Sequence, residues 1–157
     1  MGAQDQAWAD ALRLRYFPPE RNHLPAHITL FHHLPPTCLA EVQDRLARLA
    51  QEPRPRARLE GFYSLGGGVA VRVESAELLA LRDYLADHFA LLLTPQDRAS
   101  PRLHITIQNK VTAEVARATL AEVSAEFRPR PLVIAGLAAW HYRGGPWSLI
   151  RRYRFRG

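Results

Sequence analysis

Two short stretches of the sequence, His27-Ile28-Thr29-Leu30 and His104-Ile105-Thr106-Ile107, share one pattern and lie 77 positions apart. In each tetrad a His and a Thr are separated by one residue and alternate with aliphatic residues. Side chains two positions apart on a strand point to the same face of the sheet. Each tetrad therefore predicts a strand that presents an imidazole beside a hydroxyl on one face and apolar groups on the other.

The similarity extends upstream of the two tetrads. At the same offset, Pro18 corresponds to Pro95, Glu20 to Asp97 and Arg21 to Arg98. Since the chain has only six Thr among 157 residues, two His-x-Thr pairs inside such a register are not expected by coincidence. We interpret the chain as two half-domains, each of which delivers one His and one Thr to a shared site.

Length and composition predict one soluble globular domain. A chain of 157 residues with 47% apolar residues can bury a substantial core, and we expect residues 1–157 to form a single domain. The first residues contain no apolar segment typical of a secretory signal, and no later apolar run reaches the length of a membrane span. We therefore expect a cytoplasmic protein without a membrane partner.

Charge and cysteine content restrict the chemistry. The net charge of +6 is carried by twenty Arg and one Lys, a balance that favours anionic partners such as phosphate, although coding preference explains an Arg bias equally well. The single Cys38 excludes an internal disulfide framework and a Cys-rich zinc site.

Periodicity predicts strands that alternate with helices. Thr37 and Ser75 precede two of the expected helices as N-caps, and Gly66-Gly67-Gly68 is typical of a hairpin turn. Loops are expected over 17–25 and 94–101, a short extended segment over 91–93, and a turn at Gly144-Gly145-Pro146. Strands are expected over 9–16, 26–33, 56–65, 69–74, 102–110, 132–143 and 147–155, and helices after Thr37 to 49, over 75–89 and over 112–127. This order favours an α+β fold with mostly antiparallel pairing.

The two tetrads suggest acid and base chemistry on a phosphodiester. Two imidazoles on opposite sides of one phosphorus can act as general base and general acid near neutral pH, without a metal or another cofactor. The two Thr hydroxyls can donate to non-bridging oxygens and stabilise the charge of the pentavalent state. A cyclic phosphodiester suits such a site because its ring oxygen needs a proton as it leaves.

The duplicated His-x-Thr-x pattern resembles the signature of the 2H phosphoesterase superfamily, in particular its LigT-like, 2′-5′ RNA ligase branch, and the resemblance covers nearly the whole chain. It implies an α+β, bilobal, pseudo-two-fold fold with two mostly antiparallel sheets around a central cleft and helices outside. It also implies metal-independent chemistry on 2′,3′-cyclic phosphates or 2′-5′ linkages. By this resemblance His27 and His104 are catalytic, as acid and base respectively, and Thr29 and Thr106 bind the phosphate.

Other residues are candidates for substrate binding. Arg21 and Arg98 occupy equivalent loop positions, where surface ion pairs with Glu20 and Asp97 are the alternative. Phe31 and Gln108 follow the tetrads by one further alternation on the same expected face. Lys110 and Arg102 can contact phosphate or be solvated strand ends. Aromatic residues of the last hairpin can stack a base or pair within the sheet: Trp140, Tyr142 and Trp147.

Two further interpretations concern metals and function class. His23, His32 and His33 lie near His27, but their spacing matches no recognised metal site, so we expect no metal. The leading function is a phosphodiesterase of RNA 3′ ends that acts as a monomer. The alternatives are an enzyme for small cyclic or 2′-5′ linked nucleotides, such as an ADP-ribose cyclic phosphate or an oligoadenylate, and a non-catalytic RNA-binding module.

Overall fold

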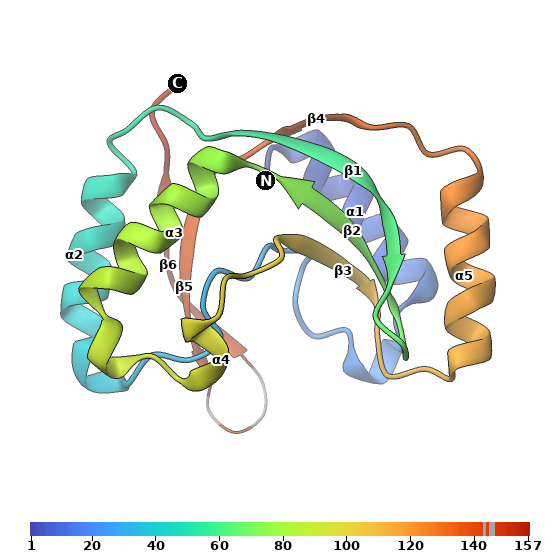
Figure 1. Ribbon diagram of the computed structural model, residues 1–157, viewed down its shortest axis with the longest axis horizontal. Helices are drawn as coiled ribbons and strands as arrows, with labels where there is room; N and C mark the ends of the chain where they lie inside the picture. The colour runs from blue at the N-terminus through green and yellow to red at the C-terminus, as the bar shows by residue number, and fades with distance from the viewer. Residues whose placement is uncertain (143, 145–146) are drawn as a thin grey trace. The chain divides into compact units, whose positions relative to one another are not determined.

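The computed structural model describes residues 1–142, 144 and 147–157, and it has an α+β fold. Gly145 and Pro146 of the expected last turn lie outside the described residues. Figure 1 shows the elements. The helices are α1 (Ala3–Tyr16), α2 (Leu39–Leu49), α3 (Ala76–His88), α4 (Pro95–Arg98) and α5 (Ala113–Ala125), and the strands are β1 (Arg56–Ser64), β2 (Val69–Glu74), β3 (His104–Gln108), β4 (Arg130–Val133), β5 (Gly136–Tyr142) and β6 (Trp147–Arg154).

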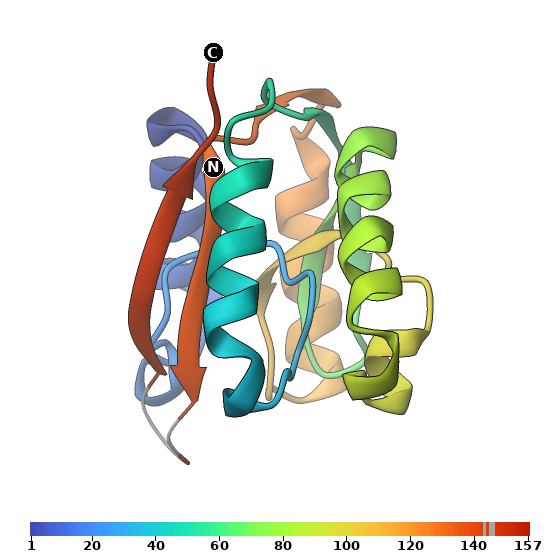
Figure 2. The ribbon, with the colours of Figure 1, turned by 90° about the vertical axis from the view of Figure 1, so that its left-hand side faces the viewer.

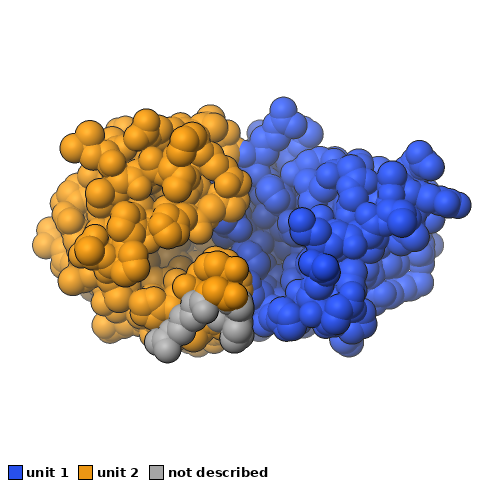
Figure 3. All heavy atoms as spheres, turned by 90° about the horizontal axis from the view of Figure 1, so that it is seen from below, with its two compact units in different colours: residues 1–29, 57–74, 102–133 blue, residues 30–56, 75–101, 134–157 orange. Residues whose placement is uncertain are grey.

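The chain divides into two compact units that interleave along the sequence (Figure 3). Unit 1 comprises residues 1–29, 57–74 and 102–133, and unit 2 comprises residues 30–56, 75–101 and 134–157. The His and Thr residues of both tetrads therefore belong to unit 1.

Unit 1 is built on a four-stranded sheet with the order β3-β2-β1-β4. The expected glycine hairpin joins β1 to β2: Leu65 N–H donates to the Gly68 carbonyl at 2.9 Å, and Gly66 has a φ of +83°, which favours glycine. Gly68 also lies so close to the neighbouring strand end that a Cβ there would stand 2.1 Å from the Gln108 carbonyl oxygen.

The two faces of this sheet have different compositions. One face carries apolar residues such as Leu59, Val71 and Ile105, all 0% exposed, and we call it the core face. The Phe62 ring continues this face and packs with Trp8 of α1 and with Phe127 just after α5, at ring centroid distances of 6.2 and 5.1 Å. The opposite face, defined by Tyr63, Arg72, His104 and Thr106 and called the motif face below, carries the polar residues.

Unit 2 combines helices α2, α3 and α4 with the antiparallel pair β5–β6. Figure 2 shows α2 beside β5 of this pair. Ser75 caps α3 as predicted, since its hydroxyl accepts from Leu78 N–H at 3.0 Å. The carboxylate of Asp97 in α4 is buried and accepts backbone N–H groups of His32 and His33 and the Nδ1–H of His32, at 2.8 to 3.1 Å.

The strand predicted over residues 9–16 is wrong, because this segment belongs to helix α1. The alternation of Leu12, Leu14 and Tyr16 suggested a strand, yet Leu14 is 80% exposed. The buried residues of α1 are Asp5, Ala9 and Arg13, which recur every four positions as a helix requires. Two members of this buried stripe are charged, so hydrophobic periodicity does not reveal it.

Several smaller predictions also need correction. Thr37 provides no side-chain cap and belongs to a 3-10 turn, Pro36–Cys38, before α2. Residues 91–93 overlap another 3-10 turn, Ala90–Leu92, rather than an extended segment, and α4 lies within the expected loop 94–101. The single strand expected over 132–143 is two strands, β4 and β5. The segment expected as a strand over 26–33 makes one isolated bridge.

Candidate active site

The first tetrad runs antiparallel to the second, and Ile28 bridges to Ile105. This register sets His27 opposite Thr106 and Thr29 opposite His104, with all four side chains on the motif face. Directly opposite pairs have Cβ atoms about 5 Å apart, and diagonal pairs about 7 to 8 Å. The two imidazoles therefore lie on one diagonal and the two hydroxyls on the other, related by a local two-fold axis at the bridge.

Both imidazoles are oriented in the same way. Nδ1 of His27 lies 2.9 Å from the Pro25 carbonyl oxygen, and Nδ1 of His104 lies 2.6 Å from the Arg102 carbonyl oxygen. A carbonyl oxygen only accepts, so each Nδ1 carries the hydrogen and donates it. This tautomer leaves Nε2 of each neutral imidazole with a free lone pair, the atom that a proton-transfer catalyst needs.

Helix α1 holds the backbone just before His27. Asp10 accepts the Ala26 N–H at 2.6 Å, and Gln6 donates to the Ala26 carbonyl at 2.9 Å and to Asp10 at 3.0 Å. Both backbone polar groups of Ala26, its N–H and its carbonyl, are therefore bound by side chains four residues apart on one helix face. Gln6 and Asp10 were not predicted as functional residues, although the spacing of 6, 10 and 13 is that of one polar helix face. The prediction of a strand over 9–16 concealed this face.

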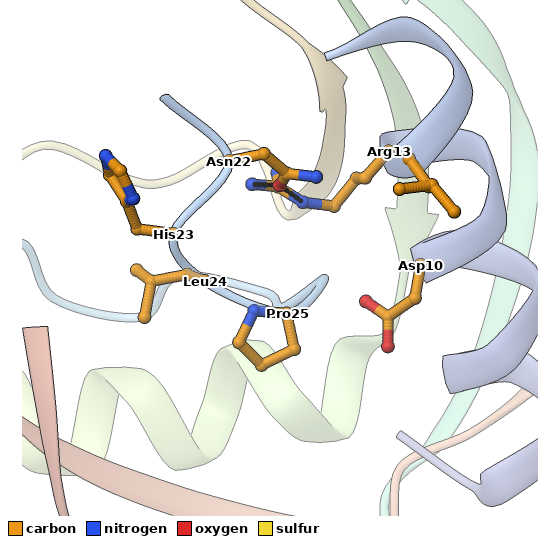
Figure 4. Close-up of a pocket in the computed structure, with 7 residues that line it drawn as sticks. Asp10, Arg13, Asn22, His23, Leu24 and Pro25 are labelled. Carbon is orange, nitrogen blue, oxygen red and sulfur yellow. Dashed lines mark hydrogen bonds between the residues drawn. The ribbon is translucent and has the colours of Figure 1, made fainter. Parts of the chain in front are cut away.

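Arg13, on the same face of α1, holds the second tetrad. Its Nη1 donates to the Thr106 carbonyl at 2.8 Å, and its Nε and Nη2 donate to the Asn22 side chain at 3.1 and 2.8 Å. Figure 4 shows the guanidinium directed at Asn22, beside a pocket of about 330 Å³ that Asp10, Arg13 and the segment 22–25 line. Arg13 is 5% exposed, and burial lowers its pKa, while the Asp10 charge raises it.

The electrostatic environment of His27 favours the neutral imidazole. The residue reaches solvent at the surface, but the atoms packed around it desolvate the ring and lower its pKa, and the carbonyl of Pro25 opposes this shift. The positive charges of Arg13 and His104 lower the pKa further, and Asp10 raises it. The charge coupling to His104 agrees with the diagonal placement of the two imidazoles.

The family model of the 2′-5′ RNA ligase superfamily matches residues 2–146. The chain belongs to this superfamily. Membership supports a phosphodiesterase type of function for the site. It confirms the expected family of 2H phosphoesterases for this superfamily member.

Among solved structures, this superfamily member is similar to the protein TT0787 of Thermus thermophilus. The two chains share 20% identity with a TM-score of 0.58, and the match covers 100% of this chain and 94% of that chain. At this identity the likeness concerns the fold, and it confirms the α+β fold class. A search of the curated protein sequences finds no significant match.

Gln108 does not lie where the alternation predicted. It is 2% exposed, and its amide donates to the Thr119 hydroxyl of α5 at 2.9 Å. A register shift between Val69 and Ala70 pairs Val69 with Gln108 but Ala70 with Thr106. The extra residue of this β-bulge, Ile107, turns Gln108 to the core face.

The remaining candidates are distributed over both units. In unit 1, Arg21 is exposed at the end of a 3-10 turn, and Lys110 is exposed after β3 with a φ of 63°. In unit 2, Arg98 is exposed at the end of α4, and the Phe31 ring packs under the Arg82 guanidinium at 5.0 Å. Trp140 is half-buried, and Tyr142 is 61% exposed and packs against Trp147 in a tilted arrangement, with ring centroids 4.8 Å apart.

Two further observations concern metals and membranes. Among the residues that the structure describes, no group of three or more His, Cys, Asp or Glu side chains is placed to hold a metal ion. Within the same residues, every helix is too short or too polar to cross a membrane.

Proposed function

We propose that this protein is a metal-independent phosphodiesterase that hydrolyses 2′,3′-cyclic phosphate ends of RNA by paired-histidine acid and base catalysis. The observation that supports this proposal is the alternation of two imidazoles and two hydroxyls around the Ile28–Ile105 bridge. A tetrahedral phosphodiester has an approximate two-fold axis that passes between its oxygens, so that the two non-bridging oxygens form one related pair and the two ester oxygens form the other. The two non-bridging oxygens can accept hydrogen bonds from the two hydroxyls on one diagonal. The two imidazoles on the other diagonal can then approach the attacking and the leaving oxygen.

The proposed reaction uses each histidine once. His104 accepts a proton from water through Nε2, and the water oxygen forms a bond to phosphorus. The bond from phosphorus to the ring oxygen breaks, and His27 gives its proton to that oxygen, which leaves a 2′- or 3′-phosphomonoester. Thr29 and Thr106 donate to the non-bridging oxygens throughout. The order of the two histidines follows the family resemblance, and the two-fold geometry permits the reverse reaction with exchanged roles.

Substrate binding also favours the protonated form of His27, the proposed general acid. In the free protein the lowered pKa of His27 favours its neutral form. A bound phosphodiester brings a negative charge between the imidazoles and stabilises the protonated form. We therefore propose that His27 takes up its proton as the substrate binds.

The test is incubation in EDTA with a 2′,3′-cyclic-phosphate RNA oligonucleotide and, separately, with its mononucleotide, followed by separation of the 2′- and 3′-phosphate products. Turnover of the oligonucleotide supports the proposal, and a preference for the mononucleotide supports the small-nucleotide alternative. No turnover of either substrate by a folded protein would contradict the proposal. Oligoadenylate and ADP-ribose cyclic phosphate would then be tested, and RNA binding without turnover would indicate a binding module.

A further inference from the structure

The motif face continues beyond the four tetrad residues onto the next two strands. Across the β2–β3 pair, Arg72 lies opposite His104 and Ala70 lies opposite Thr106. Across the β1–β2 pair, Gly61 lies opposite Arg72 and Tyr63 lies opposite Ala70. Opposite residues share a face, so Arg72 and Tyr63 lie on the same face as His104 and Thr106. Neighbouring strands are about 4.8 Å apart, which places Arg72 one strand and Tyr63 two strands away from β3.

The side chains of this neighbouring patch contact one another. The Tyr63 and His104 rings meet edge to face with centroids 6.1 Å apart, and the Arg72 guanidinium lies 5.7 Å from the Tyr63 ring. Ala70 lies on the strand between the two rings and is 0% exposed, so a small residue permits the rings to meet across β2. A Cβ at Gly61 would meet no atom within 4 Å, which leaves open space beside Arg72.

Among the described residues, neither Arg72 nor Arg102 forms an ion pair, whereas Arg56 and Arg58 pair with Glu77 and Glu60 at 2.5 and 3.2 Å. Both Arg72 and Arg102 are exposed. Arg102 precedes His104 by two residues, and its carbonyl orients that imidazole.

The charges of both guanidinium groups act on the phenol of Tyr63. Burial raises its pKa, and the charges of Arg72 and Arg102 each lower it. The phenol therefore keeps its hydrogen and can donate it to an anion. Two unpaired guanidinium groups and one hydroxyl donor next to a half-buried catalytic candidate suit a phosphate group, which accepts several charge-assisted hydrogen bonds.

We propose that Arg72, Arg102 and the Tyr63 hydroxyl bind a second phosphate of the substrate, the one that neighbours the scissile phosphodiester. This inference rests on the proposed function and specifies its substrate class. The preferred substrates are nucleotides or oligonucleotides that carry a phosphate next to the reacting one, rather than a cyclic mononucleotide with a single phosphate.

The test measures the binding of reaction products, so it does not depend on turnover. Calorimetry compares adenosine 2′-monophosphate with adenosine 2′,5′-bisphosphate, and the 3′-monophosphate with the 3′,5′-bisphosphate. The expected result is an affinity at least tenfold higher for one bisphosphate than for its monophosphate. Equal affinities within each pair would overturn the second-phosphate site. Failure of the proposed function would show separately, as absence of hydrolysis of both cyclic substrates in EDTA.

Substitutions then locate the second phosphate. In Arg72→Met the ratio of the two affinities should fall toward one, and Arg72→Lys should give an intermediate ratio because it retains the charge and loses the planar fork. Arg58→Met is the matched control, since Arg58 is an exposed arginine of the same sheet that already pairs with Glu60. A fall of the ratio in Arg58→Met equal to that in Arg72→Met would show a general charge effect and would overturn the assignment to this patch.

Discussion

The two tetrads have nearly the same sequence and the same imidazole geometry, but they are supported in different ways. The second tetrad lies in strand β3, which pairs with β2 from Val69 to Arg72, and its Ile105 and Ile107 are 0% exposed. The first tetrad makes one isolated bridge. Its backbone is held by side chains of α1 instead, through Asp10 and Gln6 at Ala26.

This difference shows that a repeated motif does not require a repeated scaffold. In the second tetrad, backbone hydrogen bonds and buried aliphatic side chains hold the strand. In the first, the hydrogen bonds of Asp10 and Gln6 with the backbone of Ala26 do so, and we call this set of contacts the clamp at Ala26. It depends on each partner, because a buried polar group that loses its hydrogen bond destabilises the fold. The first tetrad should therefore be more sensitive than the second to the loss of Asp10 or Gln6, whereas Arg13 of the same helix contacts the second tetrad.

The largest effect should come from the two imidazoles, in which the tetrads are equivalent. His27→Ala and His104→Ala should each lower kcat/KM by roughly 100-fold or more, because each removes one proton transfer. The measurement is hydrolysis of a 2′,3′-cyclic-phosphate oligonucleotide, with circular dichroism as the control for folding. Full activity in either folded variant would contradict the two-histidine mechanism.

A smaller effect should distinguish the contacts that hold the first tetrad from those that hold the second. Asp10→Ala removes the acceptor of the Ala26 N–H and should lower the free energy of unfolding by about 1 to 3 kcal/mol, with a loss of activity through misplacement of His27. Asp10→Asn keeps an acceptor oxygen and should retain most of both. Urea unfolding and kcat/KM measure the two quantities.

The matched control for Asp10 is Asp44→Ala. Asp44 lies on the exposed surface of α2, where it pairs with Arg48 at 2.9 Å, and its loss should leave stability and activity nearly unchanged. If Asp10→Ala and Asp44→Ala behaved alike, the clamp at Ala26 would not hold the first tetrad.

The smallest effect concerns the protonation of His27. Its pKa should lie below the ordinary value of about 6.5, and Asp10→Asn should lower it further, because the Asp10 charge raises it. NMR titration of the imidazole Cε1–H, assigned with the His27→Gln variant, measures both values. A pKa at or above that of an exposed histidine would contradict the desolvated environment.

The same shift has a consequence for stability. The unfolded chain, with the higher pKa, binds more protons than the folded chain between about 6.5 and the lowered folded value. The His27 contribution to the free energy of unfolding is therefore complete above about pH 6.5 and falls as the pH drops through that window. The His27→Gln variant should lose this part of the pH dependence.

Much of the fold was predictable because it depends on local signals. The hairpin at Gly66–Gly68, the strands β1 and β2, the Ser75 cap and helix α5 follow from turn residues, alternation and capping that a short window of sequence contains. Helix α1 was not predictable in this way, because its buried stripe of Asp5, Ala9 and Arg13 is mostly polar. The buried Asp5 carboxylate has partners far away in the sequence, because it accepts the Val133 N–H, 128 positions away, and pairs with Arg130.

The sequence by itself determined which residues are the candidates for the proposed chemistry: two His and two Thr with a spacing of two, each pair on one face of an extended segment. Only the tertiary structure decided how they meet, through the Ile28–Ile105 bridge and the carbonyls that fix both imidazoles. It also decided that a bulge turns Gln108 into the core and that Gln6, Asp10 and Arg13 hold the tetrads. The physical reason is that a buried polar side chain is stabilised by partners distant in sequence, which no local pattern specifies.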